Sequence, residues 1–117
     1  MTRTPYLTFE KLDAYRVARE ALGIAMDHRS AWSGLPGQIA SQFERALVSM
    51  ALNIAEGAGR ESQADQRRHY AIARGSANEA GAVLEIVAAY RALAPETHGA
   101  IRSRLIRVVQ MLNSMIR

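Results

Sequence analysis

The segment "NIAEGAGR", residues 53–60, places an amide, a carboxylate and a guanidinium three and four residues apart within an apolar helical pattern. Glu56 and Glu79, with a histidine, would make a carboxylate metal site of the kind found in helical bundles. The chain lacks the Glu-x-x-His repeat of such sites, and "EGAGR" ends a helix rather than following a strand as a phosphate-binding loop does. We therefore expect no metal, no cofactor, no catalytic residue and no enzymatic activity. A small-ligand site at Glu56 and Arg60 is kept as an alternative.

The histidines give little support for catalysis. His28, His69 and His98 fall in three different predicted segments, and two of them lie near helix ends or loops, which is typical of surface or capping histidines. The chain has no cysteine, so a thiolate nucleophile is excluded and a reducing compartment is allowed. No apolar run is long enough to cross a bilayer or to form the core of a secretory signal, so we expect a cytoplasmic protein.

Helical periodicity predicts how these groups are positioned. A chain of 117 residues has the length of one domain, and four apolar-periodic segments lie between clusters of glycine, proline and serine. Pro36 suits the first turn of the second helix, Ser62 can cap the third, and Pro95 stops the third. The predicted fold class is all-α, an antiparallel four-helix bundle forming one domain over 1–117 and assembled into a ring-like homo-oligomer. The predicted helices are 9–28, 36–58, 62–94 and 97–116.

A column of polar side chains follows the second predicted helix and is flanked by apolar residues. This pattern favours partly buried polar groups that bond to one another and tie the second helix to the third. If the chain reverses near residues 60 and 61, Arg45 can pair with Glu79, and removing one partner would cost about 3 to 5 kcal/mol if the other is buried. Glu56 would accept bonds from Arg60 or from amides of the next helix. The full column is Gln42, Arg45, Ser49, Asn53, Glu56 and Arg60, with Ser76 and Glu79 opposite.

The third predicted helix carries two apolar stripes, which is more than a small monomer needs. One stripe can face the core of the bundle. The other requires cover, and a second subunit of the same protein is the expected cover. The alternative is a central helix buried on both sides within one chain. The core stripe is Tyr70, Ala73, Ala77, Leu84, Val87 and Ala88, and the candidate oligomer interface is Ile72, Val83, Ile86, Tyr90 and Leu93.

The basic residues indicate a possible nucleic-acid partner. The formal net charge is +4, and fourteen of the fifteen basic residues are arginine, whose planar guanidinium suits phosphate. Clustered arginines can contact phosphates without reading sequence. The alternative is an ordinary solvated surface on a protein-interaction module with no nucleic-acid role. The candidate nucleic-acid-binding residues are Arg67, Arg68, Arg74, Arg102, Arg104 and Arg107.

The run "QFERALVSMALNIAEGAGRESQADQRRHYAIARGSANE" resembles the signature of the four-helix bundle proteins often called 23S rRNA intervening sequence proteins. "FEKLDAYRVA" resembles the opening helix of that family. The resemblance implies a four-helix bundle that commonly forms a homopentamer and whose biochemical role is largely unassigned. The matching positions are Gln42, Arg45, Ala46, Ser49, Asn53, Ile54, Ala55, Glu56, Gly57, Arg60, Ala73, Gly75, Ser76 and Glu79.

A related protein, the accessory variability determinant of diversity-generating retroelements, is a basic pentameric barrel that binds nucleic acid and a reverse transcriptase. By analogy only, a reverse-transcriptase-like protein is a further candidate partner. We therefore expect a non-enzymatic oligomeric bundle that acts as a nucleic-acid-binding or ribonucleoprotein accessory module. The expected partners are further copies of the chain, with a pentamer favoured by the resemblance, and RNA or DNA. No membrane partner is expected.

Overall fold

Four long helices and two short ones account for the regular structure in the computed structural model, which describes residues 7–117 except for the side chains of residues 10 and 11. No strand occurs in that part of the chain, and the predicted all-α bundle is confirmed. The elements are the 3-10 helix η1 (Thr8–Lys11) and the α-helices α1 (Asp13–Asp27), α2 (Arg29–Trp32), α3 (Ile39–Ala58), α4 (Gln63–Ala89) and α5 (Pro95–Ile116).

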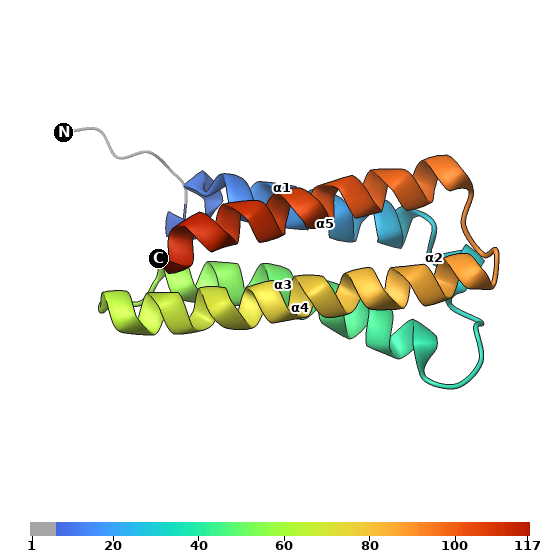
Figure 1. The fold of residues 1–117 in the computed structure, drawn as a ribbon, viewed down its shortest axis with the longest axis horizontal. Helices are drawn as coiled ribbons and strands as arrows, with labels where there is room; N and C mark the ends of the chain where they lie inside the picture. Colours follow the sequence, from blue (N-terminus) through green and yellow to red (C-terminus); the bar gives the residue numbers. More distant parts are fainter. Residues whose placement is uncertain (1–6) are drawn as a thin grey trace.

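The four long helices pack in two layers, with α1 beside α5 in one and α3 beside α4 in the other (Figure 1). Each long helix runs antiparallel to the one before it, as short connections require. Contacts between α1 and α3 and between α4 and α5 join the layers, so the hydrophobic core lies along the centre of a body measuring 51 × 29 × 21 Å.

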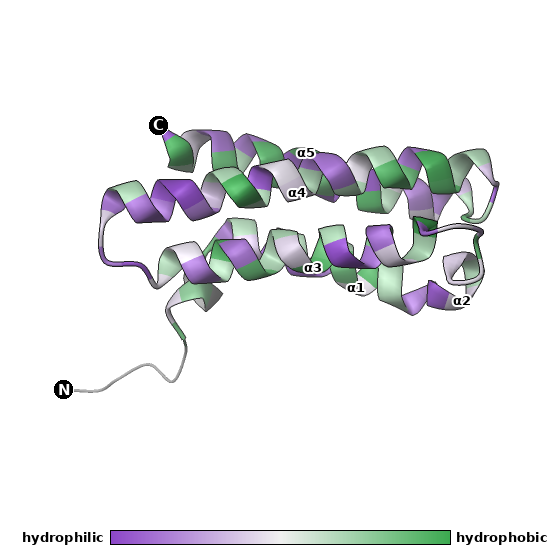
Figure 2. Cartoon of the chain, turned by 90° about the horizontal axis from the view of Figure 1, so that it is seen from below, coloured by the Kyte–Doolittle hydropathy of each residue, from purple (hydrophilic) through white to green (hydrophobic). Residues whose placement is uncertain are grey.

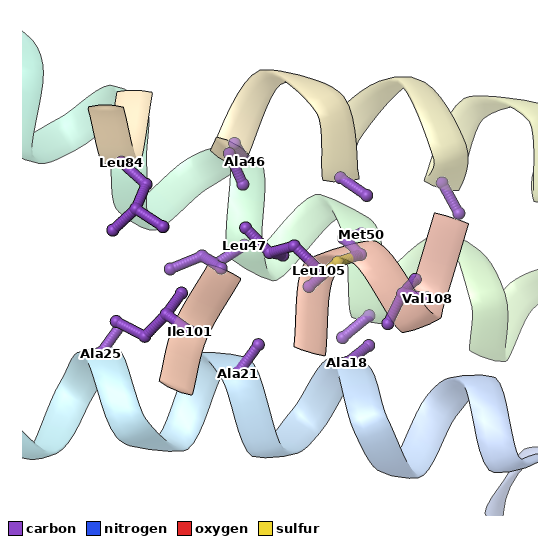
Figure 3. Close-up of a cluster of buried hydrophobic side chains, with 14 of the residues drawn as sticks. Ala18, Ala21, Ala25, Ala46, Leu47, Met50, Leu84, Ile101, Leu105 and Val108 are labelled. Carbon is purple, nitrogen blue, oxygen red and sulfur yellow. The ribbon is translucent and has the colours of Figure 1, made fainter. Parts of the chain in front are cut away.

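Alanines on one face of α1 bring that helix close to its neighbours (Figure 3). They recur at steps of three and four, each 2% exposed or less, whereas α3 and α5 supply the larger side chains of the core. The alanines are Ala14, Ala18, Ala21 and Ala25, and the larger residues drawn around them include Leu47, Met50, Ile101, Leu105 and Val108.

The first predicted helix, 9–28, is interrupted in the structure. The chain forms η1 first, and α1 begins at Asp13 after Leu12 adopts an extended conformation. Helix α2 was expected to be part of a loop. It carries Trp32, which is fully buried, donates a hydrogen bond from Nε1 to the Ala25 carbonyl oxygen at 2.9 Å and meets Phe43 edge-on. Burial of this indole is the physical reason for the extra helical turn.

Two other helix ends differ from the prediction. Helix α3 begins at Ile39 and not at Pro36, because Gly37 takes a positive φ of 66°, which is incompatible with a right-handed helix. Helix α4 ends at Ala89 and not near Ala94. There Arg91 adopts a left-handed φ of 58°, and the amide of Ala92 bonds back to the carbonyl of Val87, the pattern of a Schellman cap.

The hydropathy of the surface varies along α4. Figure 2 shows hydrophilic residues gathered over its first turns, beside the connection from α3. Within residues 7–117, none of the helices combines the length and apolar character that a membrane crossing requires.

Candidate functional site

The turn between α3 and α4 is closed by local hydrogen bonds. The amide of Asp65 donates to the Ser62 hydroxyl at 3.1 Å, which is the cap expected at the start of α4. The side-chain amide of Gln66 donates to the Arg60 carbonyl at 2.9 Å. These bonds satisfy polar groups that the reversal of the chain would otherwise leave unpaired.

Gly57 allows the two helices to approach closely beside this turn. A Cβ built on Gly57 would lie 2.6 Å from Cε1 of Tyr70 and 3.1 Å from Cβ of His69, both closer than normal carbon contacts. The Tyr70 ring is buried, so it has little room to move aside. Desolvation by this burial raises the pKa of the Tyr70 phenol above its ordinary 10.0.

A continuous set of hydrogen bonds, here called the hairpin network, crosses from α4 to α3 and back. His69 Nδ1 lies 3.2 Å from Asn53 Oδ1, and Asn53 Nδ2 donates to the Ser49 carbonyl oxygen at 2.9 Å and to Ser49 Oγ at 3.2 Å. Ser49 Oγ and Ser76 Oγ lie 2.8 Å apart. Ser49 and Asn53 of the predicted polar column are therefore bonded to α4.

His69 is 5% exposed, so the expectation of a surface or capping histidine was wrong at this position. Arg68 Nη2 lies 3.3 Å from its Nε2. Guanidinium can only donate and the amide oxygen of Asn53 can only accept, so this assignment places the ring proton on Nδ1 and the lone pair on Nε2. Both ring nitrogens are thus engaged. The sequence signal was the spacing from Asn53 across the turn, which places the two residues level on facing helices.

Glu56 and Arg60 do not bond to each other. Glu56 Oε2 lies 3.6 Å from His69 Nδ1, whereas Arg60 Nε lies 3.6 Å from Asp65 Oδ2. The pocket at the turn is lined by Gly59, Arg60, Glu61, Ser62 and Asp65 and does not include Glu56. The expected bond from Arg60 to Glu56 is absent, because the Ser62 cap places Asp65 close to Arg60.

The expected Arg45–Glu79 ion pair is also absent. Both side chains are exposed, and among the described residues neither has a charged partner within ion-pair distance. They instead line one cavity of about 350 Å³ between α3 and α4, here called the polar pocket. Exposure explains the missing pair, because water stabilises both charges and pairing gains little. The lining residues are Gln42, Arg45, Ala46, Ser49, Ser76 and Glu79.

The candidate oligomer interface is divided by the structure. Ile72, Ile86 and Tyr90 are exposed on α4, but Val83 is only 5% exposed and belongs to the core, and Leu93 packs partly against it. Helix packing covers Val83 although helical projection placed it with the exposed stripe. The prediction missed Val48 and Leu52, which are exposed on α3, although they flank the polar column four residues apart.

The six candidate arginines do not share one surface. Arg68, Arg102 and Arg104 each lie within 4 Å of a carboxylate: Asp65, Glu85 and Glu20, respectively. Arg74 donates to Asn113 Oδ1 at 2.8 Å, and Arg67 lines a pocket at the same end of α4 and α5 with Gln63, Gln66, Met115 and Arg117. Arg107 is exposed on α5. Arg67 and Arg117 line the same pocket, and Arg74 lies seven residues along α4 from Arg67; these three are here called the arginine cluster.

The other two histidines lie apart from these sites. His28 Nδ1 is 3.0 Å from the Ile24 carbonyl oxygen at the end of α1. His98 Nε2 is buried, lies 3.5 Å from Glu85 Oε1 and makes no hydrogen bond in the structure. Among the described side chains, those of residues 7–9 and 12–117, no group of three or more acidic or histidine residues is arranged to hold a metal ion.

The chain is similar to one known protein family in sequence and to a solved structure in fold. The family model for the 23S rRNA-intervening sequence protein matches residues 11–114. The chain belongs to this family. A crystal structure of an S23 ribosomal protein family member from Bacteroides thetaiotaomicron, described as having unknown function, has a TM-score of 0.78 to this chain at 23% identity. The match covers 89% of this chain and 98% of that chain, and at this identity it establishes a shared fold. A comparison with curated proteins found no significant match.

The 23S rRNA-intervening sequence signature quoted from this chain extends from Gln42 to Glu79. It therefore spans both the hairpin network and the polar pocket on the facing sides of α3 and α4. The run also includes two members of the arginine cluster, Arg67 and Arg74, whereas Arg117 lies outside it.

Proposed function

We propose that the chain is a non-enzymatic, self-associating helical module that binds nucleic-acid phosphates through the arginine cluster. The observation that supports this most directly is that Arg67, Arg74 and Arg117 lie at one end of the α4–α5 pair without a carboxylate within ion-pair distance among the described residues. Unpaired guanidinium groups keep their field available to an anion. The family and neighbour descriptions, which name 23S rRNA and a ribosomal protein family, agree with a nucleic-acid partner.

Self-association strengthens this proposal physically. Exposed apolar residues on both helices of the α3–α4 hairpin lose water contact when another copy covers them. Val48 and Leu52 occupy one side of α3, and Ile72, Ile86 and Tyr90 lie on α4. An assembly presents several arginine clusters at once, so weak phosphate contacts are multiplied by multivalency.

The proposal of a non-enzymatic role rests on how the polar groups are used. His69 Nδ1 bonds across to Asn53 of α3 and Nε2 bonds to Arg68 of its own helix, which leaves this buried ring no free nitrogen for proton transfer. The network therefore serves packing in this proposal, and the same holds for Asn53 and Ser49.

Binding to mixed RNA and DNA oligonucleotides across a salt series tests the nucleic-acid proposal. Phosphate binding weakens steeply with salt, and each lost contact lowers the slope by about 1. We expect Arg67→Glu with Arg74→Glu to abolish binding. Arg19→Glu on α1, an exposed arginine with no ion pair among the described residues, is a charge-reversal control and should retain binding. Arg68 is left unchanged because it contacts His69 and Asp65. Binding that is insensitive to both the salt and the double change would refute the proposal.

A protein-interaction module is the second candidate function. It is favoured by the exposed apolar residues of the hairpin and by an apolar groove of about 380 Å³ between α4 and α5, whose lining includes Gly81, Leu105 and Ile106. Light scattering shows which of these two surfaces joins copies of the chain. Ile72→Ser with Ile86→Ser on the hairpin should lower the mass of the assembly, whereas Ile106→Ser in the groove should not. A monomer mass for the parent chain at micromolar concentration would remove the self-association part.

A further inference from the structure

Two side chains of opposite charge line the polar pocket without forming an ion pair with each other. Arg45 comes from α3 and Glu79 from α4, and both are exposed and unpaired among the described residues. The volume of about 350 Å³ is within the range of pockets that bind small molecules. Apart from Ala46 the lining is polar, so the pocket favours a small hydrophilic molecule over an apolar one.

The two charges limit what that molecule can be. A simple anion such as phosphate would gain from Arg45 but would be repelled by Glu79, and a simple cation would meet the reverse situation. A molecule with a carboxylate at one end and a hydrogen-bonding ammonium at the other satisfies both residues at once. A quaternary ammonium is less suitable, because it has no N–H group to donate to the Glu79 carboxylate.

The hydroxyl pair on the pocket wall adds a donor. Ser49 and Ser76 together hold two hydroxyl hydrogens, and their mutual bond of 2.8 Å uses one. Asn53 occupies a lone pair of Ser49 Oγ by donating to it, so the hairpin network fixes the hydroxyl pair in place. The second hydroxyl hydrogen is left for an acceptor in the pocket, and a carboxylate held by Arg45 is such an acceptor.

We propose that the polar pocket binds a free α-amino acid with a small or polar side chain. In this arrangement Arg45 and the hydroxyl pair hold the carboxylate of the ligand. Glu79 and the amide oxygen of Gln42 accept from its ammonium group. The side chain of the ligand extends toward solvent or over Ala46, which offers little apolar surface. The site is separate from the arginine cluster, so it does not depend on nucleic-acid binding.

Amide NMR of the full chain, titrated with glycine, L-serine and L-glutamine at millimolar concentration, tests the proposal. At least one amino acid should shift the signals of Ala46, Ser49 and Ser76. Acetate and methylammonium, which each carry one of the two charges, should shift them far less. Betaine, which lacks ammonium hydrogens, should behave like acetate. Failure of all three amino acids to shift these signals would overturn the proposal, and so would equal effects of acetate.

Charge-removing variants assign the two ends of the ligand. Arg45→Gln should weaken amino-acid binding about tenfold or more, the loss expected for a charge-assisted bond. Glu79→Gln should also weaken it, and should improve the binding of acetate because the repelling charge is gone. Arg107→Gln and Glu61→Gln are exposed controls away from the pocket and should leave affinity unchanged.

Measurement of assembly mass for the same variants distinguishes a ligand from a second copy of the chain. The proposal requires Arg45→Gln and Glu79→Gln to keep the parent mass and the parent helical content. A lower mass without any amino-acid effect would overturn it and would assign Arg45 and Glu79 to a contact between copies.

Discussion

The polar column makes different contacts at the two ends of the α3–α4 hairpin. Near the turn, Asn53 and His69 bond to each other, and Gly57 lets Tyr70 pack against α3. Farther from the turn, Arg45 and Glu79 face a pocket and remain unpaired among the described residues. We call these the closed end and the open end.

Burial explains the difference between the two ends. His69 is almost completely buried, so a ring nitrogen without a partner would carry a desolvation cost of about 1–3 kcal/mol. Arg45 and Glu79 are exposed, and water satisfies them without a fixed partner. A polar column at helical spacing therefore indicates facing groups, but the depth of each group decides whether it bonds to protein or stays available for a ligand.

The largest expected effect is at Gly57. Gly57→Val places a Cβ 2.6 Å from Tyr70 Cε1 and adds two methyl groups beyond it, so we expect a loss of about 3 kcal/mol of unfolding free energy from overpacking. Urea denaturation measures it. Gly75→Val on α4 is the matched control, because a Cβ there meets nothing within 4 Å, and it should change stability by less than about 0.5 kcal/mol. Equal effects at both positions would mean that close helix approach is not special to the closed end.

The hairpin network should show the next largest effect. Asn53→Ala removes the acceptor of His69 Nδ1 and the donor to Ser49, for an expected loss of about 2 kcal/mol in thermal or urea unfolding. Gln42→Ala, at the open end of the same column, should lose less than about 0.5 kcal/mol. A small effect at Asn53 would show that water replaces the network at no cost, contrary to its burial.

Alkaline pH should weaken the closed end through Tyr70. Its pKa is raised in the folded state by burial, so the unfolded chain releases the phenolic proton first. The contribution of this group is fully present below about pH 10 and is lost as pH rises through the folded pKa. Denaturation measured on either side of pH 10 should reveal this loss. Tyr70→Phe should remove it, whereas Tyr90→Phe, which changes an exposed ring, should retain it.

The smallest expected effect is at the open end. Arg45→Ala should change the free energy of unfolding by less than about 0.5 kcal/mol, because the exposed guanidinium has no ion pair to lose among the described residues. This replaces the loss of 3 to 5 kcal/mol expected from sequence for a buried pair with Glu79. A loss of several kcal/mol in a denaturation experiment would erase the distinction between the two ends.

Periodicity predicted the bundle because long amphipathic helices leave a strong pattern in the sequence. The cap at Ser62 was likewise readable from a single residue. The left-handed Arg91, which ends α4 early, was not, since non-glycine residues seldom take that conformation. The interpretation of Pro95 as the stop of the third helix was wrong, because α4 ends at Ala89 and Pro95 is the first residue of α5, a position that proline favours. The helical spacing of the polar column on α3 predicted which residues of α4 lie opposite it only to within one helical turn.

Burial of individual side chains was harder to predict than secondary structure. His69 is buried against α3 and Val83 lies in the core, and helical projection of α4 alone contains no information about the positions of the neighbouring helices. The candidate site has the same limit. The spacing brought Arg45 and Glu79 together, but it could not show that a pocket separates them.

Trp32 gives the bundle an internal optical probe. It is the single tryptophan of the chain, and its indole is fully buried and bonded to Ala25 at the end opposite the α3–α4 turn (Figure 1). Its fluorescence therefore reports the packing of α1 against α3 far from Gly57 and Asn53. If the chain unfolds in one cooperative step, Trp32 emission and helical circular dichroism will change at the same urea concentration, even in variants altered at the distant turn.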